Sequence, residues 1–378
     1  MSLSLSKLTM TQFRNYPAAR IEIDKNMVIL TGANGAGKTN LLEAISLLTP
    51  GKGMRNANLA DIRHKDAHAA EFWAVAAEFN TDTGSLHIGT GEDRQKNKRI
   101  IRINGTTAKS QAALAEHTSA IWLTPQMDGL FLDSPSARRR FLDRLCFNFD
   151  PAHVGRTHKL DKAVRERSKI LRQNGPNADP LWLDTLEKTI SECSVAISAA
   201  RQNMIERLQI ACQKLNQSDK VFPIPIMVVD GWLEQNLSQS PAIKVEENMR
   251  QSLTDARQID SQLGGASFGA QKSDWQVRHH AQNMPAAQCS TGEQKALLIS
   301  IMLANAHISQ AENGFTPLLL LDEIVAHLDV KRRAALFDIL NQMQAQTWIT
   351  GTDVSLFDPL DTQAQFFRVE HGAIQQQK

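Results

Sequence analysis

The sequence predicts an α/β fold, with a largely parallel sheet built from both ends of the chain and a mostly helical insertion between them. Three observations support this prediction. Met27-Val28-Ile29-Leu30 is a short apolar run, followed by a glycine-rich loop and a helical pattern over residues 40–48. From about residue 134 to residue 215, apolar residues recur at helical spacing and β-branched runs disappear. Helical and strand patterns alternate again toward the C-terminus, over residues 293–308, 317–321, 330–344 and 347–352.

Short strands account for most of the remaining pattern. They are expected over residues 3–10, 21–23, 72–79, 85–89, 99–103, 222–229 and 366–370. Two stretches are turn signals, Phe13–Pro17 and Asn104-Gly105. All of these strands lie on either side of the insertion except residues 222–229, which fall within it.

The insertion is expected to contain an arm. Helical patterns over residues 153–173 and 180–215 are separated by Asn174-Gly175-Pro176, which predicts an antiparallel helical hairpin. The expected domains are therefore the N-terminal half of the α/β domain, the helical insertion and the C-terminal half, over residues 1–125, 126–262 and 263–378.

The composition is that of an ordinary soluble globular protein, with 42% hydrophobic and 22% charged residues among 378. No run of about 18 apolar residues occurs, and the first residues lack the pattern of a signal peptide. The four cysteines form no C-x-x-C pair, which argues against structural zinc and a disulfide framework. We therefore expect a cytoplasmic protein without a membrane partner. The formal net charge of +2 neither requires nor excludes a nucleic-acid ligand.

A phosphate-binding loop is expected after the first buried strand. Residues 32–39 satisfy the pattern G-x-x-x-x-G-K-[ST]. Glycines let successive backbone N–H groups point at phosphates, and the following helix adds its positive N-terminal end. Lys38 can reach the β- and γ-phosphates, and the Thr39 hydroxyl can ligate Mg²⁺. The expected ATP contacts in this loop are Gly32, Ala33, Asn34, Gly35, Ala36, Gly37, Lys38 and Thr39.

A second apolar strand ends in two carboxylates. Residues 317–321 are followed by Asp322 and Glu323. Parallel sheets bind ligands at the carboxyl ends of their strands, so we expect Asp322 to hold Mg²⁺ and Glu323 to polarise the attacking water. Glu323 and Lys38 are thus the expected catalytic residues. The alternative is a buried strand followed by an exposed acidic turn.

Three weaker motifs resemble those of the ABC ATPase superfamily. Cys289–Lys295 opens a long apolar helix and resembles the signature motif, whose helix binds the γ-phosphate held by the other subunit. The alternative for this stretch is a simple helix capped by Ser290. Asp329 fits the spacing of the D-loop, and Gln126 fits the Q-loop, whose glutamine senses Mg²⁺ and the γ-phosphate. Their order along the chain is more specific than any single motif.

Other segments point to one family. Three segments resemble the RecF family of bacterial DNA replication and repair proteins. They are Phe13-Arg14-Asn15-Tyr16, the glycine loop with the residues that follow it to Glu43, and Leu123–Gln126. The resemblance covers essentially the whole chain. Its most specific part is the run Pro135–Asp143, which reads Pro-Ser-Ala-Arg-Arg-Arg-Phe-Leu-Asp and is not a general ATPase motif.

The resemblance implies an ABC-type ATPase head, with a mixed, largely parallel sheet and flanking helices, that carries the helical insertion domain and its arm. It implies ATP and Mg²⁺ as cofactors, an ATP-bridged homodimer on double-stranded or gapped DNA, and slow, DNA-dependent ATP hydrolysis. RecO and RecR would be its mediator partners and would help RecA to load onto single-stranded gaps. Further implied ATP contacts are Arg14, Asn40, Gln126, Ser290, Gly292 and Asp329, and implied Mg²⁺ contacts are Thr39, Gln126 and Asp322.

The sequence departs from the family pattern at several positions. Residues 264–274 lack the usual Gly-Pro-His-Arg-Asp-type run, and Asp322-Glu323 replaces the Asp-Asp pair of many relatives. Thr291 and Glu293 stand where many relatives have Gln or Gly. These differences leave the hydrolysis rate open. Thr350-Gly351-Thr352 holds no histidine, so a transporter-type switch histidine is missing.

Cationic residues provide candidate contacts to DNA phosphates. They are Arg55, Arg63, Lys65, Arg94, Lys96, Lys98, Arg99, Arg138, Arg139 and Arg140. The alternatives are an ordinary solvated face, or arginines 138–140 that pair with Asp133 and Asp143 and brace the arm.

Three other functions are less compatible with the sequence. A transporter ATPase would carry the switch histidine, and a nuclease would carry a second carboxylate cluster after the acidic strand. A chromosome-organising ATPase would need a far longer insertion for its coiled coil.

Overall fold

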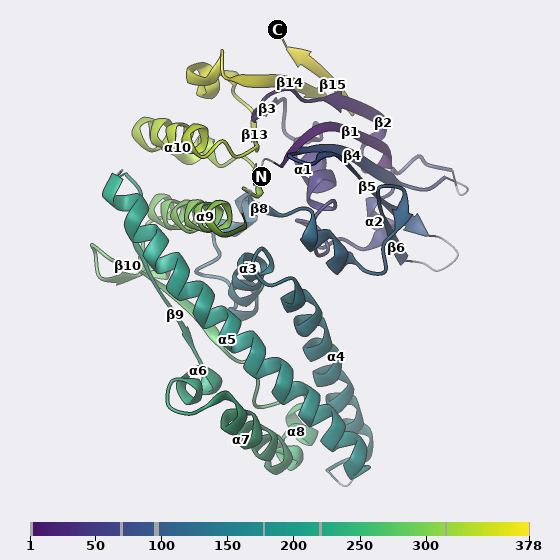
Figure 1. Cartoon of the computed structure of the whole chain (residues 1–378), viewed down its shortest axis with the longest axis vertical. Coiled ribbons are helices and arrows are strands. Elements are labelled where there is room, and N and C mark those ends of the chain that lie inside the picture. Colours follow the sequence, from purple (N-terminus) through teal and green to yellow (C-terminus); the bar gives the residue numbers. More distant parts are fainter. Residues whose placement is uncertain are drawn as a thin grey trace. The chain divides into compact units, whose positions relative to one another are not determined.

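The computed structural model describes residues 3–68, 71–93, 98–176, 178–218, 221–313 and 316–377 (Figure 1). The chain forms two compact units. The first contains residues Met1–Asp128, Lys214–Pro223 and Thr291–Lys378, and the second contains Gly129–Gln213 and Ile224–Ser290. The predicted domain boundaries after residues 125 and 262 stay a prediction. Residues 264–290 belong to the second unit, because a strand within them pairs with a strand of the insertion.

The first unit contains the expected parallel sheet, in the order β15-β14-β3-β13-β12-β8. All neighbouring strands are parallel except β14 and β15. The strands are β3 (Met27–Thr31), β8 (Ala120–Leu123), β12 (Leu318–Leu321), β13 (Thr347–Gly351), β14 (Ala364–Glu370) and β15 (Ala373–Gln377). The apolar runs of β3 and β12 are buried on both faces, as a central parallel strand requires.

Helices cover both faces of this sheet (Figure 1). Helix α1 (Lys38–Ser46) lies on one side, and α9 (Thr291–Asn313) and α10 (Val330–Met343) lie on the other. Shorter helices are α2 (Leu59–Ile62), η1 (Gln111–Glu116), η2 (Pro125–Met127), η4 (Val325–His327) and η5 (Val354–Leu360). The α/β fold class is confirmed.

A second sheet of the same unit is antiparallel, in the order β2-β1-β4-β5-β6-β7. Its strands are β1 (Ser4–Phe13), β2 (Tyr16–Glu22), β4 (Ala74–Thr81), β5 (Gly84–Asp93), β6 (Lys98–Ile103) and β7 (Thr106–Thr107). The turn expected over residues 13–17 is shorter, because Phe13 already pairs with Tyr16. Pro17 fits within β2 because β2 is an edge strand.

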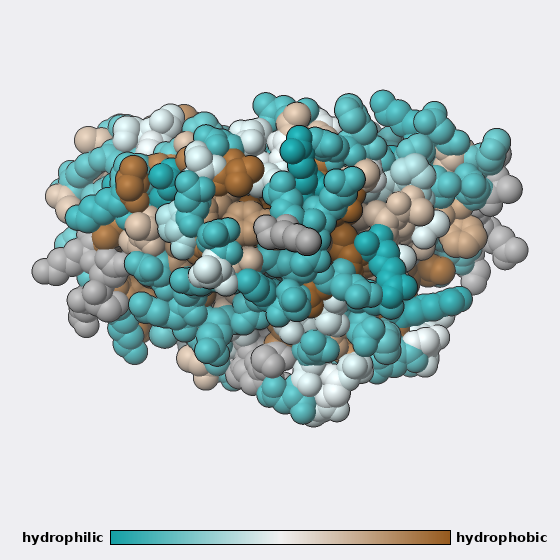
Figure 2. All heavy atoms as spheres, turned by 90° about the horizontal axis from the view of Figure 1, so that it is seen from above, coloured by the Kyte–Doolittle hydropathy of each residue, from teal (hydrophilic) through white to brown (hydrophobic). Residues whose placement is uncertain are grey.

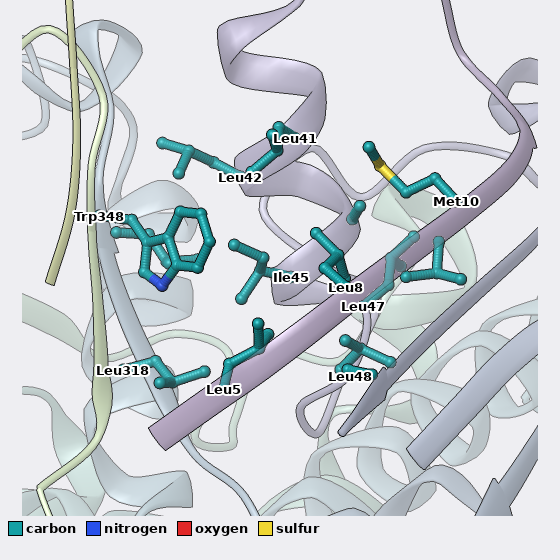
Figure 3. Close-up of a cluster of buried hydrophobic side chains, with 14 of the residues drawn as sticks. Leu5, Leu8, Met10, Leu41, Leu42, Ile45, Leu47, Leu48, Leu318 and Trp348 are labelled. Carbon is teal, nitrogen blue, oxygen red and sulfur yellow. The ribbon is translucent and has the colours of Figure 1, made fainter. Parts of the chain in front are cut away.

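Helix α1 packs between the two sheets in a core of buried side chains (Figure 3). The labelled residues are Leu5, Leu8, Met10, Leu41, Leu42, Ile45, Leu47, Leu48, Leu318 and Trp348. Replacing one such buried leucine by alanine typically costs about 2–5 kcal/mol. The core therefore fixes α1, and with it the glycine loop at the N-terminus of α1, against both sheets.

The second unit is mostly helical, with a three-stranded antiparallel sheet in the order β11-β10-β9. Its helices are α3 (Pro135–Phe147), α4 (Pro151–Asn174), most of α5 (Pro180–Ser218), α6 (Trp232–Leu237), α7 (Ala242–Asp255), α8 (Arg257–Leu263) and η3 (Ala286–Gln288). The strands are β9 (Pro225–Asp230), β10 (Asp274–His279) and β11 (Met284–Pro285). Helices α4 and α5 share one buried apolar cluster and form the expected helical hairpin.

The face drawn in Figure 2 is mostly hydrophilic, with apolar residues in small separate areas. Within the ranges given above, none of the helices combines the length and the apolar character that a membrane crossing needs.

Candidate nucleotide site

The glycine loop is shaped by positions that need glycine. Gly32 follows β3 with a φ of 149°, and a Cβ there would lie 2.3 Å from the carbonyl oxygen of Val369. Gly37 has a φ of 121°, and a Cβ there would lie 2.4 Å from Nδ2 of Asn15. Other L-residues rarely adopt such backbone conformations. The chain therefore turns directly from β3 into α1 and leaves residues 33–35 exposed.

Lys38 begins α1, and its ammonium group is buried beside the loop. Nζ donates to the carbonyl oxygens of Gly32 at 2.7 Å and Ala33 at 3.0 Å, and lies 3.7 Å from Oε1 of Glu323. Only 4% of the side chain is exposed. Charged phosphate oxygens bind an ammonium more strongly than carbonyl oxygens do. Lys38 is therefore placed to exchange its loop carbonyls for phosphates, and its contact with the β- and γ-phosphates stays a prediction.

Thr39 and Asp322 are brought together from opposite ends of the chain. The Thr39 hydroxyl lies 3.0 Å from Oδ1 and 2.9 Å from Oδ2 of Asp322, whose residue is only 2% exposed. Mg²⁺ prefers oxygen ligands and is often bound through one or two carboxylates together with substrate phosphates. The hydroxyl and the carboxylate fit that requirement, and they are the residues that would hold the ion.

Glu323 differs from Asp322 in exposure and backbone conformation. A third of its side chain is exposed, and its φ is 54°, in the left-handed region. Its backbone N–H donates to Oγ1 of Thr350 at 2.8 Å. The carboxylate thus reaches solvent next to the buried pair of Thr39 and Asp322, as a general base for water requires.

Two residues that brace the loop were missed as site residues by the sequence prediction. Nδ2 of Asn15 donates to the Ala36 carbonyl oxygen at 2.9 Å, and its Oδ1 accepts from Nδ2 of Asn40 at 2.7 Å. The Tyr16 hydroxyl donates to the Gly37 carbonyl oxygen at 2.9 Å. Burial raises the pKa of Tyr16 well above its usual range. Both residues lie in the N-terminal motif that resembles RecF, which was the available signal for their position at the site.

Arg14 contacts α1 rather than the loop. Its guanidinium binds the buried Glu43 carboxylate at 2.6 and 2.8 Å and donates to the Asp61 carbonyl oxygen at 2.5 Å. Arg55, a candidate DNA contact, donates to Oδ1 of Asn40 at 2.7 Å. An ATP contact for Arg14 and for Asn40 stays a prediction.

Gln126 is exposed in η2, directly after β8. This segment is anchored by Asp128, whose carboxylate lies 2.8 Å from Nζ of the buried Lys295 in α9. The Q-loop segment and the first turns of α9 are therefore joined by an ion pair. The predicted contacts of Gln126 with Mg²⁺ and nucleotide stay untested.

Gly292 and Asp329 form a separate group at the starts of α9 and α10. Asp329 is exposed and caps α10 by accepting from the Arg332 backbone N–H at 2.8 Å. The Arg332 guanidinium reaches the Gly292 carbonyl oxygen at 3.5 Å. Ser290 is exposed immediately before α9. These positions fit helix N-termini that can receive an anion, and their role across a dimer stays a prediction.

The candidate DNA contacts fall into paired and exposed residues. Arg63 binds Glu92 at 2.6 and 2.7 Å, Arg138 binds Asp274 at 2.8 and 2.9 Å, and Arg139 donates to the Ser273 carbonyl oxygen. Lys65, Lys98 and Arg140 are exposed, and Arg99 donates to Thr90 and to carbonyl groups. Arg94 and Lys96 lie outside the described residues. Arg138 forms an ion pair, as the alternative interpretation expected, but its carboxylate partner is Asp274 rather than Asp133 or Asp143.

The fold and this group of residues define the class. A glycine loop runs from a parallel strand into a helix with a buried lysine, and two carboxylates follow a parallel strand of the same sheet. This arrangement is that of a P-loop ATPase head, here interrupted in sequence by a mostly helical unit.

Comparisons with known proteins identify the family. Residues 4–375 match the family described as RecF/RecN/SMC N terminal domain. The chain is 43% identical over 374 residues to the DNA replication and repair protein RecF of Agrobacterium fabrum, with 98% of each chain covered. It is 44% identical over 372 residues to RecF of Mesorhizobium japonicum, with 98% of this chain and 97% of the relative covered. The chain belongs to the RecF family of DNA replication and repair proteins.

Solved structures show the same fold. The recombination mediator protein RecF with ATP matches 100% of this chain and 98% of its own, with a TM-score of 0.85 at 21% identity. An Smc head domain derived from Pyrococcus furiosus matches 99% of this chain and 96% of its own, with a TM-score of 0.55 at 14% identity. The chain therefore has a fold like those of RecF and of an Smc head domain.

Proposed function

We propose that this protein is an ATP-dependent DNA-binding protein of recombinational repair and replication restart. It binds double-stranded or gapped DNA in the cytoplasm as a homodimer bridged by ATP, and it hydrolyses ATP slowly and in a DNA-dependent way. With RecO and RecR it helps RecA to load onto single-stranded gaps. The observation that supports this proposal best is the convergence of Lys38, Thr39, Asp322 and Glu323 in a RecF-family chain.

Each of these residues has a distinct role in the proposal. Lys38 binds the β- and γ-phosphates, and Thr39 and Asp322 hold Mg²⁺, which neutralises phosphate charge when bound. Glu323 accepts a proton from the attacking water on its carboxylate. Gln126 contacts the same nucleotide.

The second copy completes each site. Ser290, Gly292 and Asp329 of the partner copy meet the γ-phosphate, so ATP joins the two subunits and its hydrolysis releases them. Support for this part comes from the exposed starts of α9 and α10. RecO and RecR are proposed as partners because a solved structure with the same fold is a recombination mediator in the RecFOR pathway.

The test measures molecular mass in solution by light scattering, with and without ATP, Mg²⁺ and gapped DNA. We expect a monomer without ATP and a dimer on DNA with ATP. Cleavage of the DNA would indicate a nuclease instead, and no DNA binding would contradict the repair function. The variant Ser290→Arg is the matched control, since it should bind ATP as a monomer but form no dimer. Dimers of that variant would show that Ser290 does not act across subunits.

A further inference from the structure

Thr350 is a buried residue near the carboxyl end of β13, the strand between the two motif strands. Strand β13 lies between β3, which leads to the glycine loop, and β12, which leads to Asp322. Leu321 of β12 pairs with Ile349 of β13, so Asp322 and Thr350 follow at the same level. Thr350 is therefore positioned by the sheet register beside the acidic pair.

The Thr350 hydroxyl contacts both acidic residues at once. It lies 2.7 Å from Oδ1 of Asp322 and 2.8 Å from the backbone nitrogen of Glu323. A backbone N–H can only donate, and an ionised carboxylate can only accept. The directions are thus fixed: Thr350 accepts from Glu323 and donates its single proton to Asp322. Thr350 is fully buried, so water does not replace either bond.

This contact restrains two different features. The bond to Oδ1 fixes the rotation of the Asp322 carboxylate, which also meets Thr39. The bond from the Glu323 N–H holds that residue in its left-handed conformation, with a φ of 54°. Such a conformation is unfavourable for a residue other than glycine and persists only where its surroundings enforce it.

We propose that Thr350 is a positioning residue of the ATPase site, which orients the Mg²⁺-binding carboxylate of Asp322 and the backbone of the general base Glu323 through one hydroxyl. The proposal rests on the proposed function of this site in ATP hydrolysis. It gives Thr350 no contact with nucleotide. Its effect is on the orientation of the Asp322 carboxylate and of the Glu323 backbone.

The test replaces Thr350 by valine, which has nearly the same shape but neither donates nor accepts. We expect ATP turnover to fall about 10–100-fold, as for other residues that orient metal ligands, with KM for ATP nearly unchanged. The Mg²⁺ concentration for half-maximal turnover should rise about tenfold. Thr350→Ser keeps the hydroxyl and should restore both values to nearly those of the unmodified protein.

A binding measurement separates positioning from loss of structure. Titration calorimetry with a slowly hydrolysed ATP analogue should give equal affinities for the unmodified protein and Thr350→Val when EDTA removes Mg²⁺. The gain in affinity on adding Mg²⁺ should be smaller in Thr350→Val. Thr347→Val is the matched control, because Thr347 is equally buried in β13 but donates only to the Ala345 carbonyl oxygen at 3.1 Å.

The outcomes decide between the two proposals. Unchanged turnover and Mg²⁺ dependence in Thr350→Val would overturn the role of Thr350, and so would a folded Thr350→Ser that behaves like the valine variant. Equal losses in Thr347→Val would show a purely structural effect and would overturn it as well. If the unmodified protein does not hydrolyse ATP, the proposed hydrolysis fails, while the Mg²⁺-dependent binding gain still tests whether Thr350 orients Asp322.

Discussion

Two buried cations, one in each compact unit, are held in different ways. Arg167 in the second unit is bound by Glu187 at 2.9 Å, Asp260 at 2.6 Å and the Leu253 carbonyl oxygen at 2.6 Å. Lys38 in the first unit has two loop carbonyls, and its nearest carboxylate lies at 3.7 Å. A cation enclosed by carboxylates is already neutralised, whereas one held by carbonyls can still bind an anion. Burial alone therefore does not tell a structural charge from a ligand-binding one.

The largest expected effect comes from Lys38→Met. This variant should lose detectable ATP binding, and with it the ATP-driven dimer and retention on DNA, because the phosphates lose their buried cation. Its unfolding midpoint without nucleotide should stay near that of the unmodified protein, while the shift on adding ATP disappears. Thermal unfolding with and without ATP measures both. Normal ATP binding by this variant would contradict the assignment of the loop.

The opposite behaviour is expected of Glu187→Ala in the second unit. The unfolding free energy should fall by about 3–5 kcal/mol, because Arg167 and Arg257 both lose a buried acceptor. Urea denaturation checks this value. The control is Glu192→Ala on the same helix, whose exposed pair with Lys188 should change the unfolding free energy by less than about 0.5 kcal/mol. Equal effects of the two variants would show that the buried ion pairs of Glu187 stabilise the fold no more than the exposed pair of Glu192 does.

Glu323→Gln separates ATP hydrolysis from ATP binding within the nucleotide site. Phosphate release should slow by about 100-fold or more, because the amide cannot take a proton from water. ATP should stay bound, so the dimer remains on DNA for longer. Phosphate release and dissociation of labelled DNA provide the measurements, with Asp353→Asn as the control for loss of an exposed carboxylate after β13. Faster DNA release would exclude the proposed role of Glu323.

The smallest effect is a pH dependence of the second unit. Burial raises the pKa of Asp143, but Arg201 at 2.8 Å and His153 at 2.9 Å outweigh burial and lower it to about 2, from 3.8. Because the pKa of Asp143 is lower in the folded state than in the unfolded state, its ionised carboxylate stabilises the fold at pH values above the unfolded-state pKa. About 2 kcal/mol should therefore be lost as the pH falls from about 4 to about 2. Urea midpoints across this range should show the loss, and Asp143→Asn should flatten it.

Local sequence patterns were sufficient for the strand–loop–helix unit and for the acidic strand. The glycine spacing has a direct backbone cause at Gly32 and Gly37, and apolar runs identify buried parallel strands. Pairings between distant residues could not be predicted in this way. The sequence left open whether Arg138 is paired, and it indicated neither Asp274 as its partner nor Glu92 as the partner of Arg63.

Strands and bracing residues were missed for the same reason. Strand β10 pairs with β9, but helices α6, α7 and α8 separate the two strands along the chain, so the short pattern of β10 carried no local signal of its partner. Thr350 reaches Asp322, and Asn15 reaches Ala36, only through sheet order and packing. Contacts of this kind depend on tertiary structure, which a single sequence pattern does not encode.

The position of β3 in its sheet has a consequence for synthesis of the protein on the ribosome. Strand β3 is flanked by β13 and β14. In β1, the backbone N–H of Leu5 donates a hydrogen bond to Gln346, which lies 341 residues further along the chain. The glycine loop is made early, but the strands that frame it are translated almost last. The second unit can fold while they are still missing. A ribosome that stops before β13 therefore releases a chain with its nucleotide loop complete in sequence but without the sheet that shapes it.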